Sequence, residues 1–390
     1  MTNTLPLAGI RIIEVCHVAA GPFCGVVLAD MGADVIKIEP PQGDSLRTWP
    51  PHSHGFSENF ASINRNKRSI ALDLKSDGDL QIARRLILSA DAIVENNRPG
   101  VMERLGLSYS SFKQEKPSLV YASISAFGQS GPRAKDGGFD ITVQAASGVM
   151  SVTGDPNGIP VKAGVPISDF GAGLYTAFAI VCLLRRVEGG GCGGHIDMSM
   201  YGANLAFSAL QTSEYFGTGK DPVRMGSGHP RNSPYQAYSA ADGEFVLAAG
   251  NDKLFTDMCR AIGRLDLETD ERFQSTSGRA GNQRQLTNIL QPIFKEKAVA
   301  YWIEIFRPLG IPCEPINSYS AALHDPLVKH HGWVQHLTLP NNHVTETFTS
   351  PIIVEGEPFS IRRTAPDLDG NRVDILEELE RFDSESQEKN

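Results

Sequence analysis

The sequence predicts an α/β protein with a large, Rossmann-like domain and a smaller α+β domain. Over about the first 200 residues, short apolar runs alternate with segments of helical periodicity. This alternation is typical of βαβ units and of a parallel sheet that is covered on both faces. From about Gly226 the pattern changes to a hairpin followed by amphipathic helices. A chain of 390 residues, 41% of them hydrophobic, is long enough for two such domains.

The first half of the chain is expected to provide the sheet of the large domain. Its short apolar runs, bounded by turn residues, predict buried strands at residues 10–15, 34–39, 69–74, 92–95, 119–125 and 195–199. Helices are expected between them, at residues 22–31, 79–89 and 143–149, in a long apolar segment from 169 to about 184, and from about 201 onward.

The second half is expected to form the small domain and a returning tail. Asp242-Gly243 joins two β-like runs, at 234–239 and 244–249, into a hairpin. We expect amphipathic helices at 252–262, 283–297 and 299–309, tail strands at 333–339 and 347–354, a last helix at 372–380, and a frayed end from 384 to 390. The predicted parts are a large domain at 1–222, a small domain at 223–324 and a segment at 325–390 that returns to the large domain.

The composition excludes several classes of function. The net charge of −9 argues against a general nucleic-acid surface, although it allows a local basic pocket. The six cysteines form no C-x-x-C pair, so a disulfide framework or a zinc site is not expected. No segment approaches the roughly 18 uncharged apolar residues of a membrane span, and the N-terminus lacks a secretory signal pattern. We therefore expect a cytoplasmic protein with no membrane partner.

Asp169 is the residue that most clearly suggests chemistry. It lies at the start of the long apolar helix, where an acid can simply cap the free backbone N–H groups. Small residues surround it, Gly171 and Gly173 follow, and no basic residue nearby offers an ion pair. A carboxylate left open beside a glycine step is a candidate nucleophile.

The loop after the first predicted strand argues against a dinucleotide enzyme. Residues 16–22 read Cys-His-Val-Ala-Ala-Gly-Pro and lack the G-x-G-x-x-G that lets a backbone contact a pyrophosphate. The loop nevertheless places small residues at the carboxyl end of a strand, where ligands bind in open α/β sheets. Another nucleotide-like ligand therefore remains compatible with this loop.

Several motifs together resemble a known family. They are Leu7-Ala8-Gly9-Ile10-Arg11-Ile12-Ile13-Glu14, His17-Val18-Ala19-Ala20-Gly21-Pro22, Gly32-Ala33-Asp34-Val35-Ile36-Lys37-Ile38-Glu39, Asn66-Lys67-Arg68-Ser69-Ile70-Ala71-Leu72-Asp73-Leu74-Lys75, Val94-Glu95-Asn96-Asn97-Arg98-Pro99-Gly100 and Gly310-Ile311-Pro312-Cys313. In this order they closely resemble the class III CoA-transferases (CaiB/BaiF family), in particular formyl-CoA transferase-like members. The resemblance implies a large domain made from both chain ends, an interlocked homodimer, acyl-CoA and carboxylic acids as substrates, and no metal or permanently bound cofactor.

The resemblance also implies a CoA site. CoA carries a pyrophosphate and a 3′-phosphate, which require several Lys or Arg groups. Segments that flank predicted strand ends supply them: Arg65, Lys67, Arg68, Lys75, Arg98, Arg104, Arg133 and Lys135. The family's CoA contacts match His17, Val18, Ala20, Leu72, Lys75, Asn96, Arg98, Arg104 and Lys135.

Asp169 matches the family's catalytic carboxylate, which forms an anhydride and then an aspartyl-CoA thioester. Backbone N–H donors for the developing oxyanion are expected from the small-domain loop at 226–229, although a simple turn is equally compatible. Gly228, His229 and Arg231 are substrate candidates. The second carboxylate of a dicarboxylate acceptor, such as succinate, itaconate, mesaconate or glutarate, requires a second cation in the site.

Two functions other than CoA transfer are compatible with the resemblance. An α-methylacyl-CoA racemase of the same family uses a His in a Gly-His-Asp motif, where this chain has Phe139 before Asp140. Asp140 is then expected near the site as a supporting acid, or as the cap of the next helix. A non-catalytic CoA-binding protein is the third reading, disfavoured by the intact Asp169. Oxalate is disfavoured as acceptor, because Ala19 and Pro40 replace the Gln and Arg of formyl-CoA/oxalate members.

Overall fold

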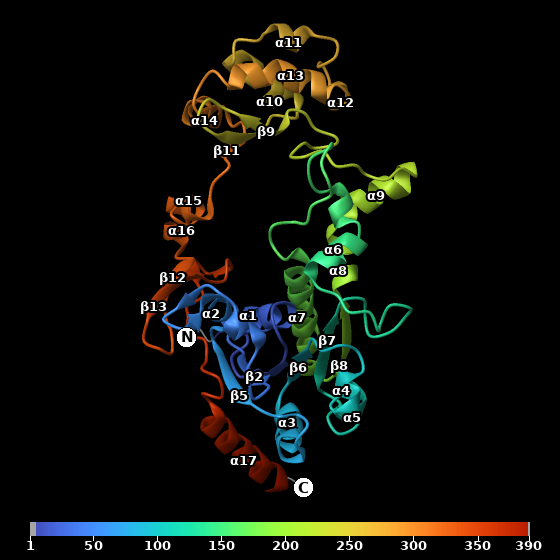
Figure 1. Cartoon of the computed structure of the whole chain (residues 1–390), viewed down its shortest axis with the longest axis vertical. Coiled ribbons are helices and arrows are strands. Elements are labelled where there is room, and N and C mark those ends of the chain that lie inside the picture. The colour runs from blue at the N-terminus through green and yellow to red at the C-terminus, as the bar shows by residue number, and fades with distance from the viewer. Residues whose placement is uncertain (1–4, 389–390) are drawn as a thin grey trace. The chain divides into compact units, whose positions relative to one another are not determined.

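Six parallel strands form the central sheet of the chain, which a computed structural model describes over residues 5–388 (Figure 1). Their order is β5 (Lys67–Ala71), β2 (Asp34–Glu39), β1 (Arg11–Val15), β6 (Ala92–Glu95), β7 (Val120–Ser125) and β8 (Gly194–Ser199), and every neighbouring pair is parallel. This result confirms the predicted α/β class with a parallel sheet.

The chain divides into two compact units. The first contains the residues up to 149, 163–218 and those from 326 onward, and the second contains 150–162 and 219–325. Both ends of the chain therefore contribute to the first unit. The short excursion at 150–162 into the second unit is not marked by any pattern in the sequence.

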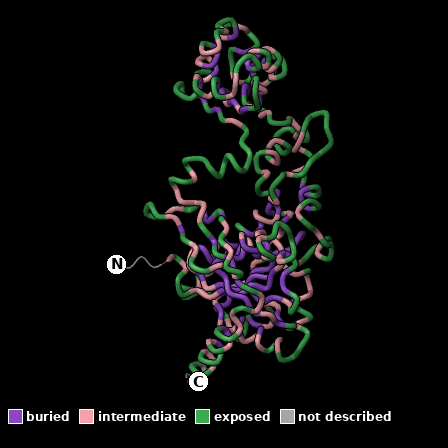
Figure 2. The backbone as a smooth tube through the Cα atoms, turned by 60° about the vertical axis from the view of Figure 1, so that its left-hand side comes forward, coloured by how far each residue is buried: buried purple, intermediate pink, exposed green. Residues whose placement is uncertain are grey.

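Alternating strand residues build a core on each face of the sheet, because successive side chains of a strand point to opposite faces. Ile12 packs in one core with α1 (Ala20–Asp30) and α7 (Ile167–Glu188), whereas Ile13 packs in the other with α3 (Asp77–Ser89) and α17 (Arg372–Glu388). Figure 2 shows the buried residues concentrated in the middle of this unit. Helices from both ends of the chain thus enclose the sheet.

Further elements complete the first unit. They are η1 (Ser45–Thr48), β3 (His52–Ser53), β4 (Phe56–Ser57), α2 (Glu58–Asn64), α4 (Val101–Arg104), α5 (Tyr109–Phe112), α6 (Asp140–Ala146), α8 (Met200–Phe207), α9 (Ala209–Thr218), α16 (Pro326–His331), β12 (Val334–Thr338), β13 (Val344–Phe348), β14 (Ile353–Val354) and β15 (Glu357–Pro358). A 3₁₀ turn, η2 (Val149–Val152), leads into the excursion.

Helix α7 corrects one expectation. It is long and apolar enough to cross a membrane by length and composition, so the statement that no segment approaches a membrane span was wrong. Core helices of soluble proteins meet the same criterion. One side of α7 is buried through Gly171, Gly173 and Thr176, and a Cβ at Gly173 would lie 2.5 Å from the carbonyl oxygen of Ala20 in α1.

Charged residues explain the shift of one strand. The strand expected at 69–74 starts at Lys67 instead, because Lys67 and Arg68 are buried in ion pairs with Glu14 and Asp34. An apolar pattern cannot mark such a strand start. The last helix was also predicted too short, since α17 continues to Glu388 and includes most of the end that was expected to fray; residues 389 and 390 lie outside the described part.

The second unit has its own antiparallel sheet and aromatic core. The strands β11 (Cys313–Pro315), β10 (Glu244–Ala248) and β9 (Tyr235–Ser239) lie in that order. Phe294 contacts the rings of Tyr238, Phe245, Trp302 and Phe306. The helices are α10 (Asp252–Ala261), α11 (Asp266–Thr269), α12 (Thr276–Gly281), α13 (Gln283–Phe294), α14 (Val299–Phe306) with the 3₁₀ turn η3 (Arg307–Leu309), and α15 (Tyr319–Leu323).

Candidate active site

A cavity of about 470 Å³ lies at the carboxyl ends of the strands of the first unit. The chain reverses its direction of strand addition between β1 and β6, and their following loops diverge there. Such a switch point is where open α/β sheets bind ligands. Most lining residues come from the loops after β1, β6 and β7 and from the starts of α6, α7 and α8, and Trp49 directly follows η1. They include His17, Val18, Ala20, Trp49, Asn96, Arg98, Phe139, Thr142, Asp169 and Met200.

Asp169 lines this cavity from the first turn of α7. Within residues 5–388 its carboxylate has no hydrogen-bond or ion-pair partner, so it does not act as the cap of its own helix. Burial, and then the nearby charge of Asp140, raises the pKa of Asp169 to about 7. A raised pKa beside a cavity is typical of a functional carboxyl group.

Asp140 caps the helix that carries Asp169. One of its carboxylate oxygens accepts a hydrogen bond from the Ser168 backbone N–H (2.9 Å), and the other accepts from Gln144 Nε2 (2.7 Å). Asp140 is also the first residue of α6. The residue therefore joins α6 to α7, and its negative charge faces Asp169 across the first turn of α7.

A second cavity, of about 400 Å³, adjoins the first. His17 and Asn97 line both cavities. Leu72 and Lys75 line the second one, at the carboxyl ends of β2 and β5. Burial, and then the charge of Lys37, lowers the pKa of His17, so its imidazole is neutral at pH 7.

The structure brings most of the expected CoA contacts to these two cavities. His17, Val18, Ala20, Asn96 and Arg98 line the first, and Leu72 and Lys75 line the second. Arg104 and Lys135 line neither cavity, and both side chains are exposed. Arg104 Nη1 approaches Gly100, in the loop after β6.

Three of the basic residues considered for phosphate binding have structural roles instead. Arg65 pairs with Asp30 at 2.6 Å, and Lys67 pairs with Glu14 at 2.8 Å. Arg68 pairs with Asp34 and Glu378. All three are buried. Their charges are neutralised inside the fold, so they are not available to the phosphates of CoA.

Sequence reasoning missed several cavity residues. Trp49 is a large apolar side chain that lines the first cavity although 47% of its surface is exposed. Phe139, already noted in the position of a racemase histidine, also lines this cavity and is 77% exposed. Met200 and Thr142 also line it. Only Trp49 could have been recognised from the sequence, because it is an aromatic residue in a loop of polar residues and prolines.

The substrate candidates of the second unit form a local turn. His229 Nδ1 accepts a hydrogen bond from the Arg231 backbone N–H (3.1 Å), and the His229 ring lies 5.1 Å from that of Tyr235. Gly228 N–H donates to the carbonyl of Met225 (2.9 Å). These residues belong to the second unit, whereas Asp169 belongs to the first.

Comparison with known proteins identifies the family. The model of CoA-transferase family III matches residues 7–372. The chain belongs to CoA-transferase family III. A succinate–glutarate CoA-transferase of Agrobacterium fabrum is 37% identical over 96% of this chain and 96% of its own length. An acetyl-CoA:oxalate CoA-transferase of Acetobacter aceti is 39% identical over 82% of this chain and 83% of its own length.

The fold of this family III member agrees with a solved structure. A CaiB/BaiF family protein from Brucella suis superposes with a TM-score of 0.85 and 35% identity, covering 97% of this chain and 100% of that one. The protein is therefore a CoA-transferase, an enzyme class that uses CoA thioesters. Within residues 5–388 no group of three or more His, Cys, Asp or Glu side chains is arranged to hold a metal ion.

Proposed function

We propose that the protein moves CoA reversibly from an acyl-CoA donor to a carboxylic acid through covalent intermediates on Asp169. The observation that carries this proposal is the unpaired Asp169 carboxylate in a cavity that adjoins a second one. The two cavities together offer room for a thioester at Asp169 and for the nucleotide of CoA near Leu72 and Lys75. Most of the implied CoA contacts lie along this path.

The reaction needs four steps and no external oxidant, reductant or ATP. A carboxylate oxygen of Asp169 attacks the thioester carbon, the C–S bond breaks, and CoA leaves as a thiolate, which produces a mixed anhydride. The thiolate then attacks the aspartyl carbonyl, the donor carboxylate leaves, and an aspartyl-CoA thioester remains. The acceptor carboxylate repeats both steps in reverse and frees Asp169. Covalent catalysis thereby replaces a direct exchange that lacks a good leaving group.

A dicarboxylate such as succinate, glutarate, itaconate or mesaconate is the acceptor class that we favour. The relative from Agrobacterium fabrum is named for succinate and glutarate, and the one from Acetobacter aceti for oxalate. Arg98 lines the cavity of Asp169 and offers a cation for a carboxylate of the acceptor. A panel of acyl-CoA donors against carboxylic acids, oxalate included, read by mass spectrometry of the CoA products, identifies the pair.

The racemase alternative lacks an acid/base partner at the expected place. Phe139 lines the cavity where a racemase needs a histidine, and a phenyl ring cannot exchange a proton. Incorporation of solvent deuterium at the α-carbon of a branched acyl-CoA, with equal and total loss of activity in Asp169→Ala and Asp140→Ala, would favour the racemase over the transferase.

We further propose that the protein works as a homodimer. Large apolar side chains are exposed along α7, α8 and α9: Leu174, Phe178, Phe207, Leu210 and Phe216, with exposed fractions of 51%, 67%, 46%, 62% and 82%. Monomeric soluble proteins rarely expose apolar patches of this kind. A second copy of the chain is the partner that we propose for these helices.

Substitution of Asp169 tests the covalent mechanism. We expect Asp169→Ala to lower turnover by about 1,000-fold or more, because the bond-forming group is lost, while acyl-CoA affinity by calorimetry changes little. Wild-type protein given acyl-CoA alone accumulates an adduct that hydroxylamine traps at Asp169 in a peptide map.

Asp136→Ala is the matched control, because Asp136 is the other carboxylate that lines the cavity and it pairs with Arg133 (3.0 Å). We expect turnover of this variant to stay within about 10-fold of wild type, since a salt bridge between exposed groups contributes little. Label on another residue, together with an active Asp169→Ala variant, would contradict the mechanism.

A further inference from the structure

We propose that Asp44 is a positioning residue: its carboxylate holds the loop of residues 16–20 in the conformation that lets a thioester approach Asp169. Asp44 does not line the cavity of Asp169, whereas His17, Val18 and Ala20 do. Asp44 therefore acts through the loop. This inference rests on the proposed role of Asp169 and adds a residue that no motif in the sequence indicated.

The loop contains a backbone conformation that valine rarely adopts. Val18 has a φ angle of 62°, in the left-handed region. A β-branched side chain collides with its own backbone there, and such a conformation persists only where the surroundings hold it. Strain of this kind concentrates at ligand sites. Val18 therefore needs other groups to hold it in place.

Side chains from two other segments fix the residues just before Val18. Lys37 Nζ, from β2, donates to the carbonyl of Cys16 (2.8 Å). Asn96, after β6, accepts from the His17 N–H at Oδ1 (2.8 Å) and donates from Nδ2 to the His17 carbonyl (2.9 Å). These contacts hold the loop on both sides of the switch point between β1 and β6.

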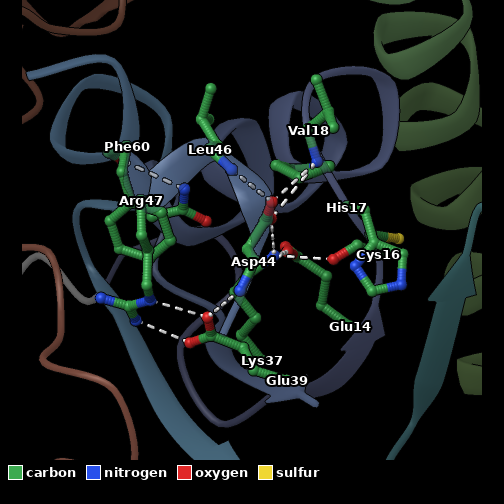
Figure 3. Close-up of polar contacts among 12 residues, drawn as sticks. Glu14, Cys16, His17, Val18, Lys37, Glu39, Asp44, Leu46, Arg47 and Phe60 are labelled. Atoms are coloured by element: carbon green, nitrogen blue, oxygen red, sulfur yellow. Dashed lines mark hydrogen bonds and ion pairs between the residues drawn. The ribbon is translucent and has the colours of Figure 1, made fainter. Parts of the chain in front are cut away.

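Asp44 holds Val18 itself, as Figure 3 shows. Both of its carboxylate oxygens lie 3.2 Å from the Val18 N–H, and one also accepts from the Leu46 N–H (3.0 Å). Asp44 is 1% exposed and forms an ion pair with Lys37 (3.0 Å), which also pairs with Glu14 (2.9 Å). Although burial opposes ionisation, Lys37 and the backbone donors keep the pKa of Asp44 below its usual range. The acceptor is therefore a fixed, buried negative charge.

Loss of this acceptor changes the position of the active-site helix. Helix α1 begins at Ala20, two residues after Val18, and a Cβ at Gly173 of α7 would lie 2.5 Å from the Ala20 carbonyl oxygen. When Val18 relaxes to a negative φ, the start of α1 must shift against the helix that carries Asp169. Misplacement of reacting groups by about 1 Å can cost about 100-fold in rate.

A double-mutant cycle between Asp44 and Val18 tests the inference. Glycine adopts positive φ about as readily as negative φ, so it needs the carboxylate less than valine does. We expect Asp44→Ala to lower kcat by about 10- to 100-fold in the wild-type background, but by no more than about 3-fold in the Val18→Gly background. KM for acyl-CoA should change much less than kcat in Asp44→Ala, because the Asp44 carboxylate lines neither cavity and the variant keeps the backbone N–H that donates to Glu39 of the second cavity. Asp44→Leu, which is close in size to Asp and has no hydrogen-bond acceptor, replaces Asp44→Ala if the alanine variant does not fold.

Asp30→Ala is the matched control. Asp30 is also a buried carboxylate (3% exposed) in an ion pair, with Arg65 at 2.6 Å, but it lines neither cavity. We expect its thermal unfolding temperature to fall at least as far as that of Asp44→Ala, with kcat within about 3-fold of wild type, because only stability is lost.

Two results would overturn the inference. One is an equal loss of kcat on removal of Asp44 in the wild-type and Val18→Gly backgrounds, and the other is a parallel loss of kcat and stability in Asp30→Ala. Hydroxylamine trapping of the Asp169 adduct distinguishes an error in the role of Asp44 from an error in the proposed function. If wild-type protein forms the Asp169 adduct but the cycle shows no coupling, only the positioning role is wrong. If wild-type protein forms no adduct, the mechanism at Asp169 is wrong.

Discussion

If Asp169 attacks a thioester, as we propose, it must be ionised, yet its surroundings oppose ionisation. Burial and the charge of Asp140 both favour the neutral form, which sets the pKa of Asp169 to about 7. A carboxylate of higher pKa is also a stronger nucleophile, and the anhydride formed on it is closer in energy to the donor thioester. The site therefore gains reactivity at the expense of the fraction that is ionised near neutral pH.

The raised pKa of Asp169 predicts the pH dependence of the enzyme. Because the carboxylate is the reactive form in the proposed mechanism, kcat/KM should fall as pH decreases through about 7. Asp140→Asn removes the neighbouring negative charge but keeps an oxygen that can accept from Ser168 N–H. We expect the acid limb of the kcat/KM profile, measured from about pH 5 to about pH 9, to move to lower pH in this variant.

Asp197→Asn serves as the control for the pH profile. Asp197 lies in β8, accepts from the Gln129 N–H (2.9 Å) and does not contribute to the shift at Asp169. Its removal should leave the acid limb in place. An unchanged acid limb in Asp140→Asn would mean that burial alone sets the pKa of Asp169.

At the scale of elements, α1 and α7, the two helices beside the cavity, can pack closely because residue 173 of α7 is a glycine. A Cβ at Gly173 of α7 would lie 2.5 Å from the Ala20 carbonyl oxygen and 3.2 Å from the Cys24 N atom, both in the backbone of α1. Backbone cannot move aside as a flexible side chain can. The close approach of α1 and α7 therefore depends on the missing side chain.

Gly173→Ala should separate α1 from α7. We expect the free energy of unfolding to fall by about 1–3 kcal/mol in chemical denaturation, since overpacking forces a backbone shift. kcat should fall as well, because the loop and Asp169 stand on the two displaced helices. Gly202→Ala in α8 is the control: its Cβ would meet Ser199 at 3.7 Å, an ordinary contact. A gain of up to about 1 kcal/mol is expected there from helix propensity.

The regular elements were predictable where burial alone shapes the sequence. The strands β2 and β6 were predicted at their observed bounds, because turns flank the apolar residues Val35, Ile36 and Ile38 of β2 and the apolar run 92–94 of β6. The start of β5 was not, since Lys67 is buried through an ion pair that only the folded chain brings together. A buried charge at the end of a strand therefore escapes an analysis of apolar patterns, whereas one flanked by apolar residues, such as Lys37 in β2, does not.

Some residues of the candidate site were likewise predictable from the sequence, and others were not. Asp169 could be found from its local setting, and Lys75 and Asn96 from the motifs of a family. Trp49 and Asp44 could not, because their relation to the site depends on contacts across many residues, such as that of Asp44 with the Val18 N–H. The spacing of residues in the sequence does not predict such contacts.

At the scale of the whole molecule, the exposed apolar side chains of α7–α9 predict a stable assembly. If a second copy covers them, the interface should exceed the standard area of about 1,600 Å², and dissociation should coincide with unfolding. Phe178→Asp should then lower the thermal unfolding temperature and produce monomer in sedimentation, because it places a charge in the interface.

Val373→Asp is the control for this experiment. Val373 is 68% exposed, as Phe178 is at 67%, but it lies on α17. A charge at an exposed position should leave both the mass and the unfolding temperature unchanged. A folded wild-type monomer at nanomolar concentration, or an unaltered Phe178→Asp variant, would exclude the proposed homodimer.

The position of α17 has a consequence for biosynthesis. Ile375 and Leu379 of α17 complete the core on one face of the sheet, and Glu378 pairs with Arg68 of β5. The ribosome makes the sheet strands within the first 199 residues, but α17 emerges only after the entire second unit. One face of the nascent sheet must therefore stay partly uncovered while the second unit is translated, at about 5–20 residues per second. Chaperone contact during this interval should concentrate on the surface that α17 later covers.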